Sequence, residues 1–421
     1  SKTGIIKTLR ITDPDKPDNL LLFVGGIGFD AAGNLLFSSA YSLRRTDPRT
    51  GGSATYIAGN NLRNFRGEGR PATKTYIFSP DKLVSDSDGN IFINDFSNGL
   101  IRKLDARTGN VQIVAGNGIP AALPPDGKAT EPTTATDVTI SRLFALDKDN
   151  NLFVSTVTRI LRIDAKTGSI TTVAGNGELG SVNGDGGPAL EARLGPVSAL
   201  ATDTKGNLFM TVAPDLDTRR YNVRRVDAQT GIITTVAGNG KAGTRGDGGP
   251  AIDAGFDMLN GMVIDKNDNL FLVDLDRIRR VDSTTSIITT VAGNGKNRYR
   301  FKGEGKKAKK ASIGFVSALA IDSLGNIFIG ARETIIADQP FRICIWRVDA
   351  KTGIITKFVE TKQNPSNGNS LDNPRGDGGP LAKASLFDIT ALGFDKNGNL
   401  LIADSESIRL VKLPSTSGLN Q

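Results

Sequence analysis

Residues 261–295 read GMVIDKNDNLFLVDLDRIRRVDSTTSIITTVAGNG, and this stretch decides the fold. It contains four short segments rich in apolar and β-branched residues or alternating them with Arg, MVI, NLFL, RIRRV and IITTV, which are separated by turn residues such as Asp, Asn and Ser. Short apolar runs of this kind, bounded by turn signals, are typical of antiparallel strands. The stretch therefore predicts one four-stranded antiparallel sheet.

The same phrase recurs about every sixty residues along the chain. The second-strand marker is found as GNLLF at 33–37, GNIFI at 89–93, NNLFV at 150–154, GNLFM at 206–210, DNLFL at 268–272, GNIFI at 325–329 and GNLLI at 398–402. The turn before the fourth strand recurs as A-x-T-G, whose Gly suits a hairpin position with positive φ. Four strands at this period indicate seven copies of a propeller blade.

The two ends of the chain complement each other. KTGIIKTL at 2–9 matches KTGIITKF at 351–358, whereas the last copy stops after SIRLVKL at 407–413. We expect the N-terminal strand, within residues 1–10, to complete the last blade and so close the array. The predicted fold is an all-β, seven-bladed propeller of four-stranded antiparallel blades over residues 1–413, followed by a flexible tail at 414–421.

A further motif stands between successive copies. It reads GDGGPA at 184–189 and 246–251 and GDGGPL at 376–381, and VAGNG precedes it at 173–177 and 236–240. Together with D-x-x-G-N-L-F and R-I-R-R-V-D, this pattern resembles the NHL repeat, especially that of bacterial NHL proteins and of the teneurin NHL domain. The resemblance implies a propeller. It also implies protein-, RNA- or glycan-binding platforms in some members, and lyases or hydrolases in related propellers.

The composition excludes several kinds of chemistry. The 421 residues include no His and one Cys, Cys344, so an intramolecular disulfide, a Cys-based zinc site and Ser-His or Cys-His nucleophile pairs are excluded. Lys and Arg exceed Asp and Glu by 52 to 44, a net charge of +8. This excess favours acidic partners, although a charge that serves only solubility explains it as well. The longest apolar stretch, near residues 20–29, is about half of the ~20 residues that a membrane span needs.

The two faces of such a propeller are predicted to differ. One carries the short D-x-x-G-N and A-x-T-G turns, which turn geometry alone explains, and we interpret it as structural. The opposite face takes the large insertions, at 213–220, 331–341 and 360–376. Variation of this kind is typical of a binding site, but insertions are also tolerated wherever no strand pairing is disturbed.

The insertion-bearing face also holds the densest positive charge. RYRFKGEGKKAKK at 298–310 and RNFRGEGRPATK at 63–74 replace the usual GDGG turn by GEG and add cations. Aromatic side chains here could stack on a base or sugar while the cations attract phosphate, sulfate or carboxylate groups. A solvated basic loop is the alternative. The candidate binding residues are Arg63, Arg66, Arg70, Arg298, Tyr299, Arg300, Phe301, Lys306, Lys307, Lys309 and Lys310.

Three aspartates are the only catalytic candidates. Asp95, Asp274 and Asp404 occupy equivalent positions after the second strand, where two carboxylates with separated pKa values could support hydrolase or lyase chemistry. An ion pair with an Arg of a nearby strand is the alternative. The GDGGP aspartates offer one carboxylate per motif, which suits capping of backbone N–H groups better than a calcium cage. No metal and no cofactor is predicted.

The sequence therefore favours a non-catalytic binding or scaffolding propeller. Its predicted partner is a protein or an acidic polymer, either a glycan or a nucleic acid, bound through the interblade and second-to-third strand loops. A carboxylate-based enzyme and a structural subunit of an extracellular assembly remain the alternatives, and the oligomeric state is open. The chain begins at Ser1 without an initiator Met, so we expect an exported, extracellular or periplasmic protein from which an N-terminal segment has been removed.

Overall fold

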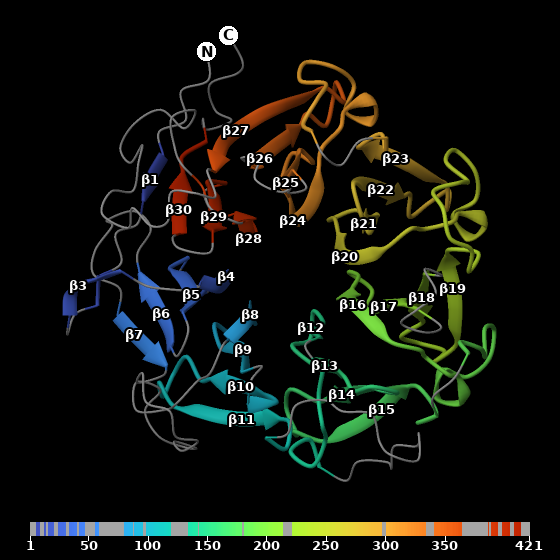
Figure 1. Cartoon of the computed structure of the whole chain (residues 1–421). Coiled ribbons are helices and arrows are strands. Elements are labelled where there is room, and N and C mark those ends of the chain that lie inside the picture. The colour runs from blue at the N-terminus through green and yellow to red at the C-terminus, as the bar shows by residue number, and fades with distance from the viewer. Residues whose placement is uncertain are drawn as a thin grey trace. The chain divides into compact units, whose positions relative to one another are not determined.

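A computed structural model of the chain gives the arrangement of most strands (Figure 1). It describes residues 6–8, 12–13, 16–20, 24–30, 33–39, 42–46, 55–58, 80–86, 88–95, 98–118, 134–141, 143–178, 181–213, 221–296, 300–333, 341–363, 386, 389–394, 398–404 and 408–413. These residues fall into two compact units, which are described separately. Unit 1 comprises Ser1–Ser85, Ala106–Asn110 and Val291–Gln421, and unit 2 comprises Asp86–Asp105 and Val111–Thr290.

Unit 2 consists of consecutive antiparallel strands. They are β9 (Ile91–Asp95), β10 (Leu100–Leu104), β11 (Val111–Ala115), β12 (Phe144–Leu146), β13 (Leu152–Ser155), β14 (Ile160–Ile163), β15 (Ile170–Ala174), β16 (Val197–Thr202), β17 (Leu208–Val212), β18 (Asn222–Val226), β19 (Ile233–Ala237), β20 (Leu259–Ile264), β21 (Leu270–Asp274), β22 (Arg277–Val281) and β23 (Ile288–Ala292), the last of which runs on into unit 1. Two 3-10 turns, η3 (Ala189–Glu191) and η4 (Ala251–Asp253), link successive sheets.

Unit 1 contains strands from both ends of the sequence. They are β1 (Ile6–Thr8), β2 (Thr12–Asp13), β3 (Lys16–Leu20), β4 (Val24–Phe29), β5 (Leu35–Ser39), β6 (Ser42–Thr46), β7 (Thr55–Ala58), β8 (Pro80–Ser85), β24 (Phe315–Ile321), β25 (Ile327–Arg332), β26 (Phe341–Val348), β27 (Ile355–Gln363), β28 (Ile389–Phe394), β29 (Leu400–Asp404) and β30 (Ile408–Val411). The 3-10 turn η5 (Ala308–Lys310) precedes β24. Strands β2 and β3 form a small additional hairpin that the repeat pattern does not predict.

The described residues form four-stranded sheets in which neighbouring strands are antiparallel. Six of these sheets are blades of four consecutive strands, β4–β7, β8–β11, β12–β15, β16–β19, β20–β23 and β24–β27. One further four-stranded sheet has the order β1-β30-β29-β28 and is composite, because Ile6, Lys7 and Thr8 pair with Val411, Leu410 and Arg409. The prediction of a seven-bladed propeller is therefore corrected to six blades of four consecutive strands. The seventh copy supplies only three consecutive strands, and the strand match between the two chain ends completes its sheet.

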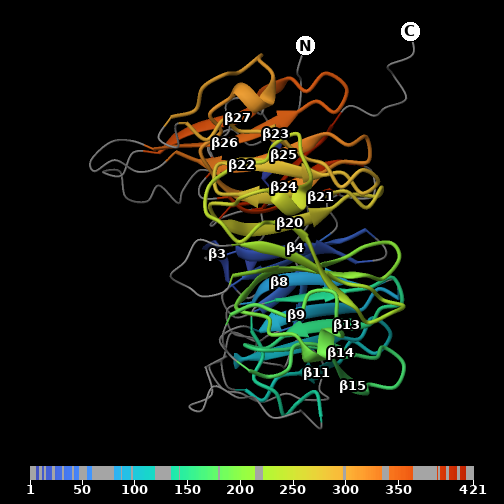
Figure 2. The same ribbon diagram turned by 90° about the vertical axis from the view of Figure 1, so that its right-hand side faces the viewer.

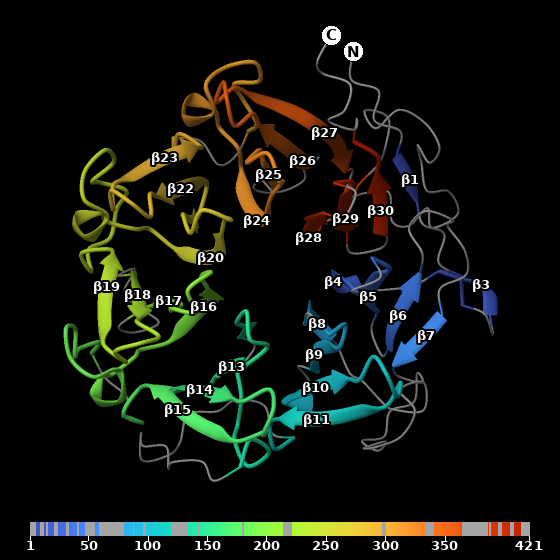
Figure 3. The same ribbon diagram turned by 180° about the vertical axis from the view of Figure 1, so that it is seen from behind.

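Packing between successive sheets follows one pattern within each unit. In unit 2 the first strands β12, β16 and β20 lie side by side, and β15 and β19 lie on the opposite side of their sheets (Figures 1 and 3). In unit 1, β24 contacts β28, β28 contacts β4, and β4 contacts β8. The second strands β9, β17 and β21 are buried along their whole length.

The core lies between the sheets. One apolar cluster joins Phe153 and Ile160 of the β12–β15 sheet to Met210 and Ile233 of the β16–β19 sheet, with Leu194 beside η3 between them. Figure 2 faces the outer strands of unit 2 and shows η3 in green and η4 in yellow on the outer side of this packing. Each connecting turn is thus held against the sheet edge and leaves part of its surface in solvent.

Candidate functional site

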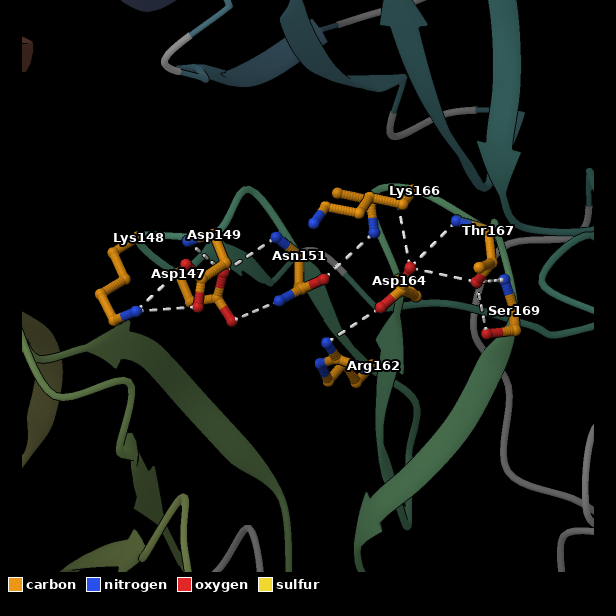
Figure 4. A network of polar contacts seen from close by, with 10 residues as sticks. Asp147, Lys148, Asp149, Asn151, Arg162, Asp164, Lys166, Thr167 and Ser169 are labelled. Carbon is orange, nitrogen blue, oxygen red and sulfur yellow. Dashed lines mark hydrogen bonds and ion pairs between the residues drawn. The ribbon is translucent and has the colours of Figure 1, made fainter.

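The turns of the predicted structural face form a repeating hydrogen-bond network. In the β12–β15 blade, Asp147 Oδ1 accepts the backbone N–H of Asn151 at 2.9 Å, and Asp147 Oδ2 accepts Asn151 Nδ2 at 2.8 Å (Figure 4). Asn151 Oδ1 accepts the backbone N–H of Ala165 at 3.1 Å and so joins the two turns of the blade. The pairs Asp203–Asn207, Asp265–Asn269 and Asp322–Asn326 repeat this arrangement. These side chains are used within the turns, as the structural interpretation expects.

The A-x-T-G turns hold an aspartate in its charged form. Asp164 accepts the backbone N–H groups of Thr167 and Lys166 and the hydroxyl of Thr167. These hydrogen bonds, that of the Thr167 backbone first, lower the pKa of Asp164 to about 2. The pKa values of the equivalent Asp227, Asp282 and Asp349 are lowered for the same reason.

The two catalytic candidates whose side chains are described are buried. Asp95 Oδ2 lies 2.8 Å from Arg102 Nε and 2.9 Å from Asn98 Nδ2. Asp274 Oδ1 accepts the backbone N–H groups of Asp257 and Met258. Both carboxyl side chains are fully inaccessible to solvent. Asp404 ends β29, and its side chain lies outside the described residues.

Asp274 differs from Asp95 in its arginine partner. Arg279 Nη1 lies 3.9 Å from Asp274 Oδ2 because the guanidinium bonds instead to the Gly255 carbonyl and to Asp247. Burial raises the pKa of Asp274 to about 6, and the backbone N–H bonds and Arg279 only partly oppose this rise. The alternative to a catalytic role was an ion pair with a nearby Arg. Such a pair is observed at Asp95 and, at a longer distance, at Asp274.

The GDGGPA turns each form an Arg–Asp clasp, a term used below for a GDGG aspartate bound to a buried third-strand Arg. Asp185 Oδ1 lies 2.9 Å from Arg224 Nη2, and Asp185 Oδ2 accepts the backbone N–H of Thr235 at 2.8 Å. Asp247 binds Arg279 and Thr290 in the same way. The clasp fixes the connecting turn to the third and fourth strands of the blade that follows it. Each Asp accepts a backbone N–H, but this N–H belongs to the fourth strand of the following blade and not, as predicted, to a neighbour of the Asp in the chain. The Arg half of the clasp was not foreseen.

The β24–β27 blade replaces this clasp. Trp346 pairs in register with Ile329, which is the position that Arg224 and Arg279 hold opposite Met210 and Leu272. Glu304 stands in place of the Asp, and its Oε1 accepts the backbone N–H of Lys357 at 3.3 Å. In this blade a Glu and a buried Trp thus stand where the β16–β19 and β20–β23 blades have an Asp and a buried Arg.

An aromatic pair fills the space beneath this turn. Phe301 packs edge-on against Trp346 with ring centroids 5.6 Å apart, and Trp346 Nε1 donates to the Ile313 carbonyl at 3.3 Å. Phe301 is only 6% exposed. The prediction that Phe301 stacks on a ligand is therefore wrong, because its ring is used in the core beneath the turn.

An ion-pair network surrounds the aromatic pair. Arg342 binds Glu333 and also Glu360, whose Oε1 lies 2.9 Å from Arg342 Nη1. Lys357 Nζ lies 2.7 Å from Glu360 Oε2 and 5.8 Å from the Trp346 ring centroid. Glu333 Oε1 also accepts the backbone N–H of Phe301 at 2.6 Å. Connected charges of this kind, with side chains at most 26% exposed, hold a fixed geometry better than isolated surface pairs do.

The aromatic pair and the ion-pair network are together called the base. They support the basic turn, which is defined as residues 300–310 and includes Phe301. Its cations Arg300, Lys302, Lys306, Lys307, Lys309 and Lys310 are all exposed. Lys307 Nζ donates to the Thr352 carbonyl at 2.7 Å. Within the part of the chain that the structure describes, no salt bridge engages Lys306, Lys309 or Lys310. The structure thus brings five predicted binding residues together, Arg300, Lys306, Lys307, Lys309 and Lys310, on one turn.

The other predicted binding residues and insertions are described only in part. Arg63, Arg66, Arg70, Arg298 and Tyr299 lie outside the described residues, as does most of the insertion at 213–220. The predicted insertions at 331–341 and 360–376 begin in regular structure, because Ala331 and Arg332 belong to β25 and residues 360–363 to β27. Strands β26 and β27 are thus longer than their counterparts β18 and β19, which have five residues each.

Neither a group of metal ligands nor a membrane-spanning helix is found among the residues that the structure describes. In them, no three His, Cys, Asp or Glu side chains gather in a way that could hold a metal ion. Nor does any helix there have the length and apolar character of a membrane span.

Comparisons with solved structures show the class of fold. The chain is similar to virginiamycin B lyase from Staphylococcus aureus, with a TM-score of 0.54 and 13% identity over 98% of this chain and 100% of that chain. It is similar to the RRP9 WD40 repeats, with a TM-score of 0.54 and 11% identity over 98% of this chain and 99% of that chain. The extracellular domain of BT4673 from B. thetaiotaomicron gives a TM-score of 0.56 and 11% identity, and the match covers 99% of this chain but only 40% of that chain.

The protein is therefore an all-β propeller. No protein-family model matches the chain, and a search of curated protein sequences gives no match. The solved structures above share at most 13% identity with this chain, so they show its fold and not its function.

Proposed function

We propose that this propeller is a non-catalytic binding or scaffolding protein of the NHL type, and that its basic turn recognises anionic macromolecules. The proposal rests on a comparison of three connecting turns. Three connecting turns share a backbone conformation, and their sequences are GDGGPALE at 184–191, GDGGPAID at 246–253 and GEGKKAKK at 303–310. The fold needs the turn but not its charge, because the first two turns form with a Pro, an apolar residue and an acid at the positions of Lys307, Lys309 and Lys310.

The base beneath the basic turn supports this proposal. Trp346, Phe301 and the Arg342 network occupy the place of an Arg–Asp clasp and hold the turn without using Lys306, Lys309 or Lys310. Cations fixed on a rigid base lose less conformational entropy on binding than cations on a loose loop. A turn that presents several unpaired ammonium groups attracts phosphate, sulfate or carboxylate groups.

The test is the affinity for a polysulfated glycan and for a single-stranded oligonucleotide, measured by fluorescence anisotropy. The triple variant Lys306→Gln, Lys309→Gln, Lys310→Gln is expected to lose about tenfold or more in affinity at low salt. The matched control Lys166→Gln, Lys205→Gln, Lys241→Gln removes three exposed lysines from other turns and is expected to change affinity by less than about twofold. Equal losses in the two triple variants would refute a localised site.

A location outside the cytoplasm is part of this proposal. The similarity in fold to an extracellular domain from B. thetaiotaomicron supports an extracellular or periplasmic protein. The test is fractionation of the native source with an antibody against the chain. Recovery in the cytoplasmic fraction alone would refute this location and leave the binding proposal intact.

A further inference from the structure

The three connecting turns share more than a sequence pattern. The residue before each 3-10 turn, Pro188, Pro250 or Lys307, has φ between −58° and −56° and ψ between 128° and 134°. Each of these residues forms an isolated antiparallel bridge to the outer strand of its blade, through Pro188–Ile232, Pro250–Ile287 and Lys307–Ile354. One backbone therefore presents three different sets of side chains at equivalent places.

The side chains of η3 and η4 complement those of η5. Leu190 is 53% exposed and Ile252 is 46% exposed, and both are followed by an exposed acid, Glu191 or Asp253. At the same two positions η5 has Lys309 and Lys310. No salt bridge with another described residue engages Glu191 or Asp253. The chain thus carries two apolar, acidic turns in unit 2 and one basic turn in unit 1.

We infer that the anionic partner of the basic turn includes a second copy of this chain. This inference rests on the proposed function, because it assigns a partner to the same turn. The ammonium groups of Lys309 and Lys310 pair with Glu191 or Asp253 of the other copy. Their aliphatic stems cover Leu190 or Ile252, which are two of the four large apolar side chains exposed among the described residues.

The contact joins two different surfaces, so it does not close on itself as a two-fold interface does. Heterologous contacts of this kind give rings or open-ended assemblies. A turn-to-turn contact buries less than the ~1,200 Å² that is typical of stable interfaces, so the association is weak and reversible. Because its charges are exposed, it is also sensitive to salt.

The test uses charge reversal in the full chain, with light scattering at high protein concentration as the readout. One variant carries Lys309→Glu and Lys310→Glu, and the other carries Glu191→Lys and Asp253→Lys. Wild-type protein is expected to gain mass with concentration at low salt and to return to single chains at ~0.5 M salt. Each variant alone is expected to stay a single chain, and an equimolar mixture of the two is expected to recover the association because complementary turns meet again.

Two results would overturn the inference. One is wild-type protein that stays a single chain at every concentration and salt, and the other is a mixture of the two variants that stays unassociated while wild-type protein assembles. Binding of the polysulfated glycan distinguishes failure of this inference from failure of the proposed function. The Glu191 and Asp253 variant is expected to keep that binding, whereas the Lys309 and Lys310 variant is expected to lose it. Glycan binding without self-association would refute only the present inference.

Discussion

Arg224 is fully buried, and its guanidinium is held by the half-exposed carboxylate of Asp185, 39 residues earlier in the chain. Arg224 Nη1 and Nη2 also donate to the carbonyls of Arg193 and Asn183, at 3.1 and 2.9 Å. A buried cation is thus satisfied entirely by the connecting turn that it positions. The turn and the sheet therefore depend on each other.

Removing the acid of this clasp should destabilise the propeller. Asp185→Ala leaves the Arg224 guanidinium buried without its carboxylate, which is expected to cost about 1–3 kcal/mol of unfolding free energy. Asp149→Ala is the matched control, since Asp149 pairs with exposed Lys148 and its loss is expected to cost less than about 1 kcal/mol. Urea unfolding of both variants is the measurement, and equal effects would contradict the clasp.

The Trp346 base should affect both stability and binding. Trp346→Ala removes the ring that packs against Phe301 and is expected to cost about 3–5 kcal/mol and to weaken anion binding, because the basic turn loses its support. Trp346→Phe keeps an aromatic side chain and is expected to retain most of both properties. Urea unfolding and anisotropy on the same samples test this. Unchanged anion affinity in a folded Trp346→Ala variant would show that the turn does not need its base.

Acid sensitivity should arise partly from the A-x-T-G turns. The pKa of Asp164 in the folded protein is about 2, below its ordinary value of 3.8, because backbone N–H groups bind the carboxylate. A lowered folded-state pKa gives stability that is present above about pH 4 and is lost as the pH falls through about 2. Asp164→Asn should therefore show a shallower loss of stability between these values in urea unfolding at several pH values. Identical pH profiles would contradict this role of Asp164.

The pH dependence of Asp274 should have the opposite sign. Burial raises its folded-state pKa from 3.8 to about 6, so the protonated form is favoured in the folded protein. The contribution to stability is complete below about pH 4 and is lost as the pH rises through about 6, by about 3 kcal/mol in total. Asp274→Asn should remove this loss between pH 4 and 7. A variant that keeps the wild-type profile in that range would refute the assignment.

Much of the fold could be predicted because each copy of the repeat marks the position of its strands in the sequence. The second-strand markers lie in β5, β9, β13, β17, β21, β25 and β29, and the match between residues 2–9 and 351–358 correctly predicted that β1 pairs with β30. The seven markers led to a prediction of seven blades, whereas the described residues form six blades of four consecutive strands, because a marker reports one strand and not the other three.

The site could be predicted less well. The lysines of the basic turn stood out as charge, but the burial of Phe301 depends on Trp346, which is 45 residues later in the chain. The Arg half of the clasp had a signal in the aligned copies, because Arg224 and Arg279 hold one register position that Trp346 holds in the β24–β27 blade. Only the strand register makes these positions equivalent, so they could be compared only once the register was known.

The most direct test of the central claim exchanges residues 303–310 of the basic turn for their acidic counterpart. Glu304→Asp, Lys306→Gly, Lys307→Pro, Lys309→Leu and Lys310→Glu convert GEGKKAKK into GDGGPALE, a sequence that forms the same backbone in the β16–β19 blade. Affinity for the polysulfated glycan is then measured at low salt on protein whose circular dichroism matches the wild type. We expect binding to be lost while the fold is retained. Wild-type affinity in the exchanged protein would contradict the account, because the lysines of residues 306–310 would then not determine binding.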